Sequence, residues 1–142
     1  MTKLQASLGD CRVIGLPTVT DARGSLSFLE GTRHVPFAFA RVFYLHGLPP
    51  GASRGAHAHL QCEQFLIPMS GALTVCLDDG RDRLDVRLES PTAGLYVPPM
   101  IWATERHFAA ETVCAVFASH QYDSEDYIRD YDSFVALRKE GR

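Results

Sequence analysis

The chain has 142 residues, of which 46% are hydrophobic and 22% are charged, and its formal net charge is −3. This composition is typical of a globular domain and excludes a disordered or fibrous chain. The length suits a single domain, expected over residues 1–142, and the weak negative charge offers no broad basic field for nucleic acid. In chain order, the first residues, MTKLQASLGDCRVIG, lack the apolar core of a secretory signal. No window approaches 18 uninterrupted apolar residues, so we expect a cytoplasmic protein without a membrane span.

Short runs rich in Val, Leu, Phe and Tyr then recur between turns that carry Gly, Pro and Asp. Such regular spacing predicts an antiparallel barrel or sandwich, that is, an all-β fold. The expected strands are residues 12–16, 26–30, 37–46, 61–68, 72–77, 84–88, 94–97 and 112–118. The segment LTVCLDDGRDRLDVRL is a hairpin signal, with Asp79 and Gly80 near its bend.

Four cysteines are scattered along the chain without a CxxC pair, which predicts free structural thiols rather than disulfides or a zinc site. Cys76 and Cys114 lie inside apolar runs and are expected to pack in the core.

Only the C-terminal segment has the pattern of a helix. Residues 123–128 carry helix-capping side chains, and Tyr127, Tyr131 and Phe134 follow at helical spacing. We expect one short C-terminal helix that docks on the barrel and whose role is structural rather than catalytic.

The most informative stretch is residues 51–71. On a strand, residues i and i+2 point to the same side, so His57 and His59 are expected to face one side together. Glu63 keeps the same parity unless a turn intervenes. The spacing resembles the first motif of the cupins: a Gly, five residues, His-x-His, three or four residues, Glu, and then a Gly, here after seven residues instead of six. The resemblance implies a cupin double-stranded β-helix, or jelly-roll barrel.

In metal-binding cupins, a second motif supplies a fourth ligand, a histidine. Five residues past Pro98, where that histidine would stand, the chain has Ala103. The missing histidine is one reason to expect no metal, and the family resemblance described below is the other; no other cofactor is expected. A metal-dependent cupin enzyme that uses His57, His59 and Glu63 for iron or zinc remains an alternative. A purely structural role of the two histidines is the simplest alternative.

Further motifs extend the resemblance over residues 10–135. They are Arg23-Gly24-x-Leu26, Arg41-Val42-Phe43-Tyr44, Arg54-Gly55-x-His57-Ala58-His59, Glu63-Gln64, Leu77-Asp78-Asp79-Gly80, Gly94-Leu95-Tyr96-Val97-Pro98, Trp102 and Tyr122-Asp123-x-x-Asp126-Tyr127-Ile128-Arg129-x-Tyr131. In combination they resemble the WxcM-like sugar 3,4-ketoisomerases. The chain departs from that family at Ala56 and Ala103, where aromatic, acidic or arginine side chains are frequent.

The resemblance implies a metal-free isomerase that acts on dTDP-4-keto-6-deoxyglucose. It also implies a homodimer that exchanges N-terminal strands, and a role in making 3-amino-3,6-dideoxyhexoses for surface polysaccharides. The stereochemistry at C4 of the product is not encoded in a recognisable motif.

This chemistry needs proton transfer at carbon and at oxygen, and imidazole titrates near neutral pH. We expect His57 to be the carbon base and His59 to assist, with the reverse assignment open. Tyr44 and Arg54 are candidates to stabilise the enediolate oxygen, and Arg54 could instead bind the pyrophosphate.

Three further residues are expected to bind substrate, each with a structural alternative. Gln64 would hydrogen-bond the sugar or cap a strand. Trp102 would stack on the thymine or pack at the barrel mouth. Arg23 would contact substrate or only form a turn. For the function of the protein as a whole, the alternative to an enzyme is a non-catalytic sugar-binding cupin.

Overall fold

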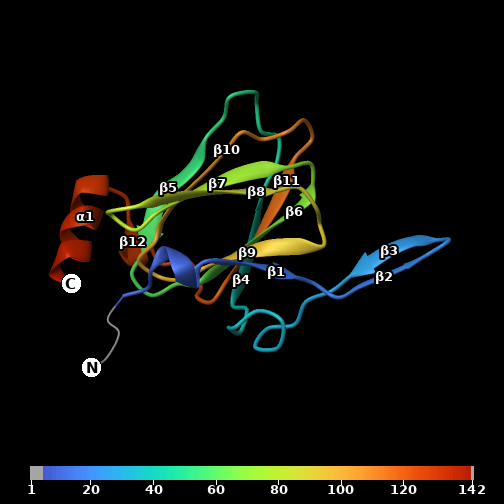
Figure 1. The fold of residues 1–142 in the computed structure, drawn as a ribbon, viewed down its shortest axis with the longest axis horizontal. Helices are drawn as coiled ribbons and strands as arrows, with labels where there is room; N and C mark the ends of the chain where they lie inside the picture. The colour runs from blue at the N-terminus through green and yellow to red at the C-terminus, as the bar shows by residue number, and fades with distance from the viewer. Residues whose placement is uncertain (1–4, 142) are drawn as a thin grey trace.

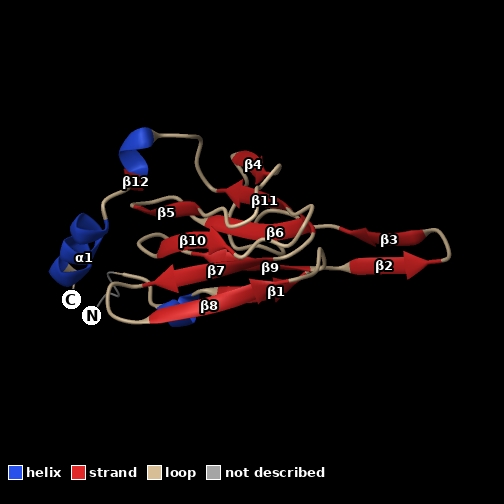
Figure 2. Cartoon of the chain, turned by 90° about the horizontal axis from the view of Figure 1, so that it is seen from above, coloured by secondary structure: helices blue, strands red, loops and turns tan. Residues whose placement is uncertain are grey.

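The computed structural model describes residues 5–141. Two five-stranded antiparallel sheets face each other, a two-stranded hairpin projects from one end of them, and a helix lies at the other end (Figures 1 and 2). The strands are β1 (Arg12–Gly15), β2 (Thr18–Asp21), β3 (Gly24–Ser27), β4 (Arg41–Leu45), β5 (Arg54–His59), β6 (Gln64–Ser70), β7 (Leu73–Asp78), β8 (Arg83–Leu88), β9 (Ala93–Val97), β10 (Trp102–Arg106), β11 (Val113–Ala118) and β12 (Tyr127–Ile128). The helix is α1 (Tyr131–Glu140), and short 3-10 turns cover Leu8–Asp10 and Ser124–Asp126.

The order of the strands is that of a cupin jelly-roll barrel. The first sheet has the order β1-β9-β6-β11-β4, and the second has the order β12-β5-β10-β7-β8. From β4 to β11, the chain crosses repeatedly from one sheet to the other, so that neighbours in a sheet come from distant parts of the sequence. The expected all-β cupin fold with a short C-terminal helix is confirmed.

Alternating side chains from both sheets form the core between them, because successive residues of a strand point to opposite faces. The buried residues of this core include Leu66, Leu73, Val75, Leu77, Leu95, Val97, Cys114 and Val116. The outer face of the first sheet is also covered, since Val35 and Phe37 of the loop before β4 pack on Phe65 and Tyr96. This explains why β6 is buried on both faces.

The hairpin of β7 and β8 is confirmed. The two strands pair from Leu73↔Leu88 to Asp78↔Arg83. At the bend, Gly80 has a φ of 92°, which favours glycine, and Asp79 Oδ1 accepts hydrogen bonds from the backbone N–H groups of Arg81 and Asp82.

The helix begins later than the sequence pattern predicts. The capping side chain of Asp123 accepts a hydrogen bond from the Glu125 N–H, but it caps only the short turn Ser124–Asp126. The next two residues pair with β5 as β12. Asp130 then caps α1 by accepting a 2.9 Å hydrogen bond from the Ser133 N–H. The prediction of a helix from residue 123 was wrong because strand pairing uses the backbone of Tyr127 and Ile128.

Several strand predictions also need correction. β10 was not expected, because its sequence WATER is too polar for a hydrophobic run. The region 37–46 is a strand only at Arg41–Leu45, and β2 and β3 form a separate hairpin around the DARG turn. All four cysteines are free, as expected, but Cys76 is half-buried on the outer face of the second sheet rather than in the core. Among residues 5–141, no helix is long and apolar enough to cross a membrane.

Candidate active site

The two histidines of the His-x-His motif lie side by side at the end of β5. His57 pairs with Ala103 of β10, and His59 pairs with Tyr127 of β12. Their ring centroids are 5.0 Å apart, and the rings are nearly perpendicular at 88°. The residue between them, Ala58, is fully buried on the other face of the strand, against Ile128 and Phe134 of the C-terminal segment. The alternation of β5 therefore directs both imidazoles to one side, as the sequence predicts.

A bulge in β5 precedes His57. Gly55 has a φ of 80° and Ala56 a φ of 61°, and the pairing with β10 shifts by one residue at this point. A Cβ atom at residue 55 would overlap the carboxylate of Glu105, so glycine is required there. A positive φ at alanine costs on the order of 1 kcal/mol. The bulge also places the backbone of Gly55 next to the His57 ring, with which it forms a hydrogen bond.

Hydrogen bonds engage both ring nitrogens of His59. Nδ1 lies 3.2 Å from Oδ2 of Asp126, and Nε2 lies 3.3 Å from the amide nitrogen of Gln64. The side chain of His59 is 6% exposed and that of Asp126 is 14% exposed. The ring of His59 is therefore fixed, whereas His57 is only half-buried.

Side chains from the C-terminal segment cover the two imidazoles. The ring of Tyr127 lies 4.9 Å from that of His57 and 4.3 Å from that of His59, between centroids. The guanidinium of Arg129 stacks 4.2 Å above the Tyr127 ring. On the β4 side, the guanidinium of Arg41 lies over the ring of Tyr122 at 5.7 Å. Tyr127 thus covers both imidazoles, and Tyr122, Arg41 and Arg129 lie around its ring.

Burial lowers the pKa of both histidines, because it disfavours the charged imidazolium. For His57, the hydrogen bond to Gly55 opposes the burial, and the charges of Arg129 and Arg41 lower the pKa further. Burial also lowers the pKa of His59, to about 4; the neighbouring His57 adds to this effect and Asp126 opposes it. Both imidazoles are therefore neutral at pH 7 and can accept a proton.

Glu63, the carboxylate of the first cupin motif, does not join the histidines. A turn separates β5 from β6, and the carboxylate points to the outer face of the first sheet, where its Oε1 accepts a 2.6 Å hydrogen bond from the Tyr96 hydroxyl. A turn does intervene, which is the exception left open from the sequence, so Glu63 does not face the same side as His59. The ligand set His57, His59 and Glu63 is not assembled.

One other group of possible metal ligands lies within residues 5–141. Nδ1 or Nε2 of His59, Sγ of Cys62 and a carboxylate oxygen of Asp126 all lie within 4.8 Å of one another. The carboxylate already accepts hydrogen bonds from the backbone N–H groups of Gln61 and Cys62, in addition to its contact with His59. The carboxylate of Asp126 is therefore already part of a hydrogen-bond network with His59 and two backbone N–H groups.

Of the other residues that the sequence singles out, only Gln64 lies at the histidines. Tyr44 is 62% exposed and stacks near His46 on the outer face of the first sheet. Arg54 lies at the start of β5, opposite Glu105. Arg23 lies at the tip of the projecting hairpin, where its guanidinium forms a 2.7 Å ion pair with Asp21. The structure of one chain does not bring Tyr44, Arg54 or Arg23 to His57 and His59.

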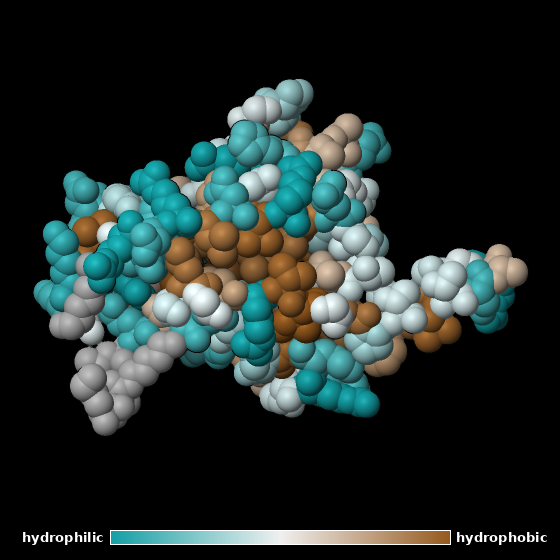
Figure 3. All heavy atoms as spheres, in the orientation of Figure 1, coloured by the Kyte–Doolittle hydropathy of each residue, from teal (hydrophilic) through white to brown (hydrophobic). Residues whose placement is uncertain are grey.

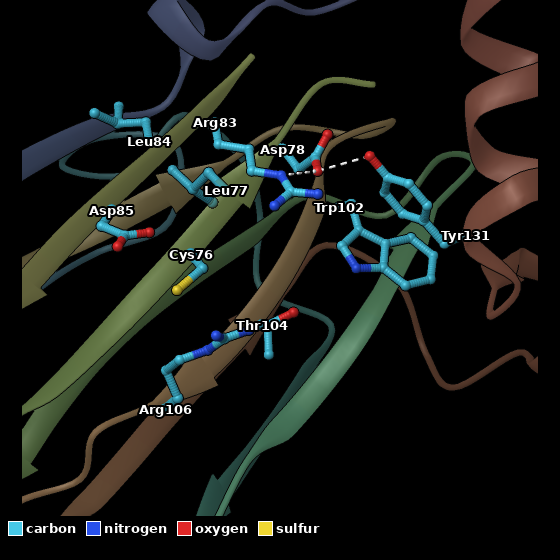
Figure 4. Close-up of a pocket in the computed structure, with 10 residues that line it drawn as sticks. All are labelled: Cys76, Leu77, Asp78, Arg83, Leu84, Asp85, Trp102, Thr104, Arg106 and Tyr131. Atoms are coloured by element: carbon cyan, nitrogen blue, oxygen red, sulfur yellow. Dashed lines mark hydrogen bonds and ion pairs between the residues drawn. The ribbon is translucent and has the colours of Figure 1, made fainter. Parts of the chain in front are cut away.

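Trp102 lies on the outer face of the second sheet, where its indole packs against Tyr131 and Phe134. Figure 4 shows it beside Tyr131 of α1, at one end of a cavity that runs along β7, β8 and β10. The volume of this cavity is about 570 Å³. The cavity contains the ion pair of Arg83 with Asp78, but neither histidine. Of the two roles considered for Trp102, stacking on the thymine or packing, its position here corresponds to packing.

Four residues around the histidines were not predicted as site residues from the sequence: Arg41, Asp126, Tyr127 and Arg129. Three of them belong to the motif Tyr122-Asp-x-x-Asp-Tyr-Ile-Arg, which the sequence predicts as a structural helix. The sequence did contain an indication of a strand here, because Tyr127 and Ile128 are an aromatic and a β-branched residue, both frequent in strands. These two residues form β12 where a helix was predicted.

Comparison with known proteins agrees with this geometry. Residues 9–139 match the family FdtA, described as WxcM-like, C-terminal. The chain is 40% identical over 136 residues to a TDP-4-oxo-6-deoxy-alpha-D-glucose-3,4-oxoisomerase from Aneurinibacillus thermoaerophilus, which covers 92% of this chain and 98% of the relative. Among solved structures, a 3,4-ketoisomerase from Helicobacter canadensis is 36% identical with a TM-score of 0.89, over 92% of this chain and 98% of the other.

A sugar 3,4-ketoisomerase from Thermoanaerobacterium thermosaccharolyticum, solved in complex with TDP, is 31% identical with a TM-score of 0.91. That match covers 94% of this chain and 98% of the other. The paired histidines of the barrel and the match over nearly the whole chain lead to one conclusion: the protein belongs to the FdtA, or WxcM-like, family of cupin-fold isomerases.

Proposed function

We propose that this protein is a nucleotide-sugar 3,4-ketoisomerase that converts a TDP-linked 4-keto-6-deoxyhexose to its 3-keto isomer. The observation that carries the proposal is the pair of neutral imidazoles, 5.0 Å apart and facing the same side of β5. The relatives named above support it, because the one at 40% identity carries the name of this reaction.

His57 is the better candidate for the base that removes the proton from C3. It is half-buried, so a substrate can reach it, and its hydrogen bond to Gly55 holds the ring in place. His59 is more deeply buried, with hydrogen-bond partners at both ring nitrogens. A general base must lie within hydrogen-bond reach of the proton it removes, and accessibility favours His57. The amide of Gln64 is placed to donate a hydrogen bond to a sugar oxygen once it leaves His59.

Arg41 and Arg129 are the candidates that would bind the diphosphate. Neither forms an ion pair with a carboxylate of residues 5–141, and Nε of Arg41 is buried without a hydrogen-bond partner. A buried guanidinium N–H without an acceptor is costly, and a phosphate oxygen would supply the acceptor. Both charges act on His57, so both guanidinium groups lie near the proposed base.

A homodimer is the assembly that best explains the hairpin of β2 and β3. Hydroxyl pairs, Thr18 with Ser27 and Thr20 with Ser25, line one face of the hairpin, whereas Val19 and Leu26 lie opposite each other on the other face and are each about 60% exposed. An isolated two-stranded hairpin is marginally stable in water. Figure 3 shows apolar residues on this hairpin and in the middle of the barrel face, between the edge strands β1 and β8. A second copy would cover both surfaces, and Arg23 at the hairpin tip would then reach the partner.

The cellular setting follows from the substrate. A nucleotide-activated sugar and four free cysteines suit the cytoplasm, where thiols stay reduced. The net charge of −3 does not favour nucleic acid or an anionic membrane as a partner. The 3-keto product would feed amination at C3 for surface polysaccharides.

Incubation with TDP-4-keto-6-deoxyglucose in D₂O, followed by NMR of the sugar protons, tests the function. We expect the C3 proton to exchange and the 3-keto isomer to appear, and we expect His57→Asn to abolish both while thermal unfolding stays unchanged. Activity in EDTA separates this enzyme from a metal-dependent cupin, which would lose activity. Tight binding without deuterium in the sugar would instead identify a non-catalytic binder.

A further inference from the structure

The carboxylate of Asp126 is held from three directions. Its Oδ1 accepts a 2.8 Å hydrogen bond from the Gln61 N–H, and its Oδ2 accepts one of 3.2 Å from the Cys62 N–H. The same Oδ2 lies 3.2 Å from Nδ1 of His59, a residue 67 positions away in the chain. The two backbone donors fix the orientation of the carboxylate before any substrate arrives.

This arrangement determines which nitrogen of His59 carries the proton. An ionised carboxylate has only acceptor sites, so the contact at 3.2 Å requires a proton on Nδ1. In a neutral imidazole, the other nitrogen, Nε2, is then an acceptor. The neighbour of Nε2 fits this assignment, since Gln64 offers its amide N–H₂ to Nε2 at 3.3 Å. That hydrogen bond is long for an N–H donor, so a sugar hydroxyl can replace it at little cost.

We propose that Asp126 is a positioning residue that keeps His59 in its Nδ1–H form, so that Nε2 carries a proton between the two oxygens of the sugar while His57 serves the carbons. The inference rests on the proposed ketoisomerase function and deepens it. Asp126 acts through His59 and does not touch the substrate.

The proton transfers balance without a further reactant. His57 removes the proton from C3, and the C–H electron pair forms the C3=C4 double bond while the carbonyl electrons move to O4. Nε2 of His59 takes the proton from O3 and delivers it to O4. The electrons on O3 re-form a carbonyl at C3, and the double bond takes the proton from His57 at C4. Asp126 stabilises the short-lived imidazolium of His59 by its negative charge.

A purely structural role for Asp126 makes a different prediction. By accepting from two backbone N–H groups, the carboxylate also holds the turn between β5 and β6. If this were its whole role, loss of the carboxylate would slow proton transfer at the sugar carbons and at the sugar oxygens by the same factor. The protonation pattern of His59 would then stay unchanged. The experiment must therefore measure the protonation state of the His59 ring nitrogens as well as the rates of the two kinds of proton transfer.

The first measurement is the ¹⁵N NMR spectrum of the wild-type imidazoles, assigned by comparison with His59→Asn. We expect the pattern of a protonated Nδ1 and an unprotonated Nε2 for His59 at pH 7.5. A protonated Nε2 in the wild type would overturn the proposal, whether or not the protein turns over a sugar.

The second measurement compares Asp126→Asn with the matched control Asp123→Asn, which removes the same charge from the carboxylate that caps the turn Ser124–Asp126 and accepts its hydrogen bond from the Glu125 N–H. In Asp126→Asn we expect the 3-keto product to form about 100-fold more slowly, within the range for loss of a proton-transfer group. The rate of deuterium entry at C3 should also fall, but by a factor at least about ten times smaller than the factor for product formation, because His57 is intact. Asp123→Asn should match the wild type in both rates.

Three results contradict the proposal: equal losses of exchange and turnover in Asp126→Asn, turnover within about twofold of the wild type, or an unchanged ¹⁵N pattern of His59 in that variant. If instead the wild type does not isomerise the sugar but shows the protonated Nδ1, the proposed function fails and the assignment of the His59 proton stands.

Discussion

The Tyr96 hydroxyl donates a 2.6 Å hydrogen bond to Oε1 of Glu63, and this contact directs the carboxylate of the His-x-His…Glu motif out of the barrel. Burial and the nearby Glu63 both raise the pKa of Tyr96, so the phenol stays protonated and remains the donor. The motif thus retains its sequence spacing but separates into two parts: a histidine pair inside the barrel and a carboxylate that ties β6 to β9.

Glu63→Gln tests this separation. We expect isomerase activity within about twofold of the wild type, because the side chain lies away from the histidines, and a loss of roughly 1 kcal/mol in the free energy of unfolding from the weakened hydrogen bond. Steady-state kinetics and urea unfolding measure the two effects. A metal enzyme that used Glu63 as a ligand would lose its activity in this variant.

Substitution of Arg129 or Arg41 by Gln should weaken substrate binding more than catalysis. Loss of a hydrogen bond between a guanidinium and a phosphate costs about 1.5–3 kcal/mol, so KM should rise about 10- to 100-fold with a smaller change in kcat. The control is Arg83→Gln in the outer cavity, which should leave KM within about twofold. A rise in KM for Arg83→Gln alone would place the nucleotide in the cavity of Figure 4 instead.

The pH dependence of kcat/KM should report the histidines of the free enzyme. A base works in its neutral form, and the pKa of His57 lies below its ordinary value of 6.5 because of burial and the two arginines. We therefore expect activity to be constant between pH 8 and pH 7.5 and to fall at lower pH with an inflection below pH 6.5. In Arg129→Gln, the acid limb should move to higher pH, since a positive charge has been removed. An inflection above pH 7 in the wild type would contradict the assignment.

Glu105 should make the barrel less stable at high pH. Burial raises its pKa from 4.5 to about 7, so between these values the folded protein binds a proton that the unfolded chain has lost. Stability therefore falls as the pH rises from 4.5 to 7, by up to about 3 kcal/mol. In Glu105→Gln, the free energy of unfolding should lose this dependence, as urea unfolding at pH 4.5 and pH 8 would show. Glu89→Gln, at an exposed position, is the control. An identical pH dependence in Glu105→Gln would refute the prediction.

The apolar face of the projecting hairpin should determine the oligomeric state. Val19→Asp with Leu26→Asp places two charges on the face that a second copy would cover, and we expect sedimentation velocity to show a shift from dimer to monomer. Thr20→Asp, on the hydroxyl face, is the matched control and should remain dimeric. A wild type that sediments as a monomer at micromolar concentration would contradict the homodimer.

The sequence predicts the barrel and the histidine pair well, for a physical reason. The histidine pair depends on alternation along one strand, and the barrel depends on the regular spacing of short apolar runs between turns; both patterns can be read from neighbouring residues. The hairpin at Asp79 and Gly80 is equally local. These features therefore appear in the structure as expected.

The other residues of the site depend on pairing between distant segments. Tyr127 reaches the histidines because β12 pairs with β5, and no pattern around either segment specifies that contact. Trp102 and Tyr44 failed to join the site for the same reason: their faces depend on the register of β10 and β4 against other strands. The helical spacing of Tyr127, Tyr131 and Phe134 is real, but α1 uses only the last two residues.

The position of β12 has a consequence for how the protein is made. When synthesis has reached the end of β11 at Ala118, every strand of the barrel except β12 exists, and His57 and His59 are already in the chain. The carboxylate and the aromatic ring that complete their surroundings come later, in residues 126 and 127. A nascent chain that has reached only Ala118 therefore lacks Asp126 and Tyr127, and the surroundings of the two histidines are complete only after β12 has paired with β5.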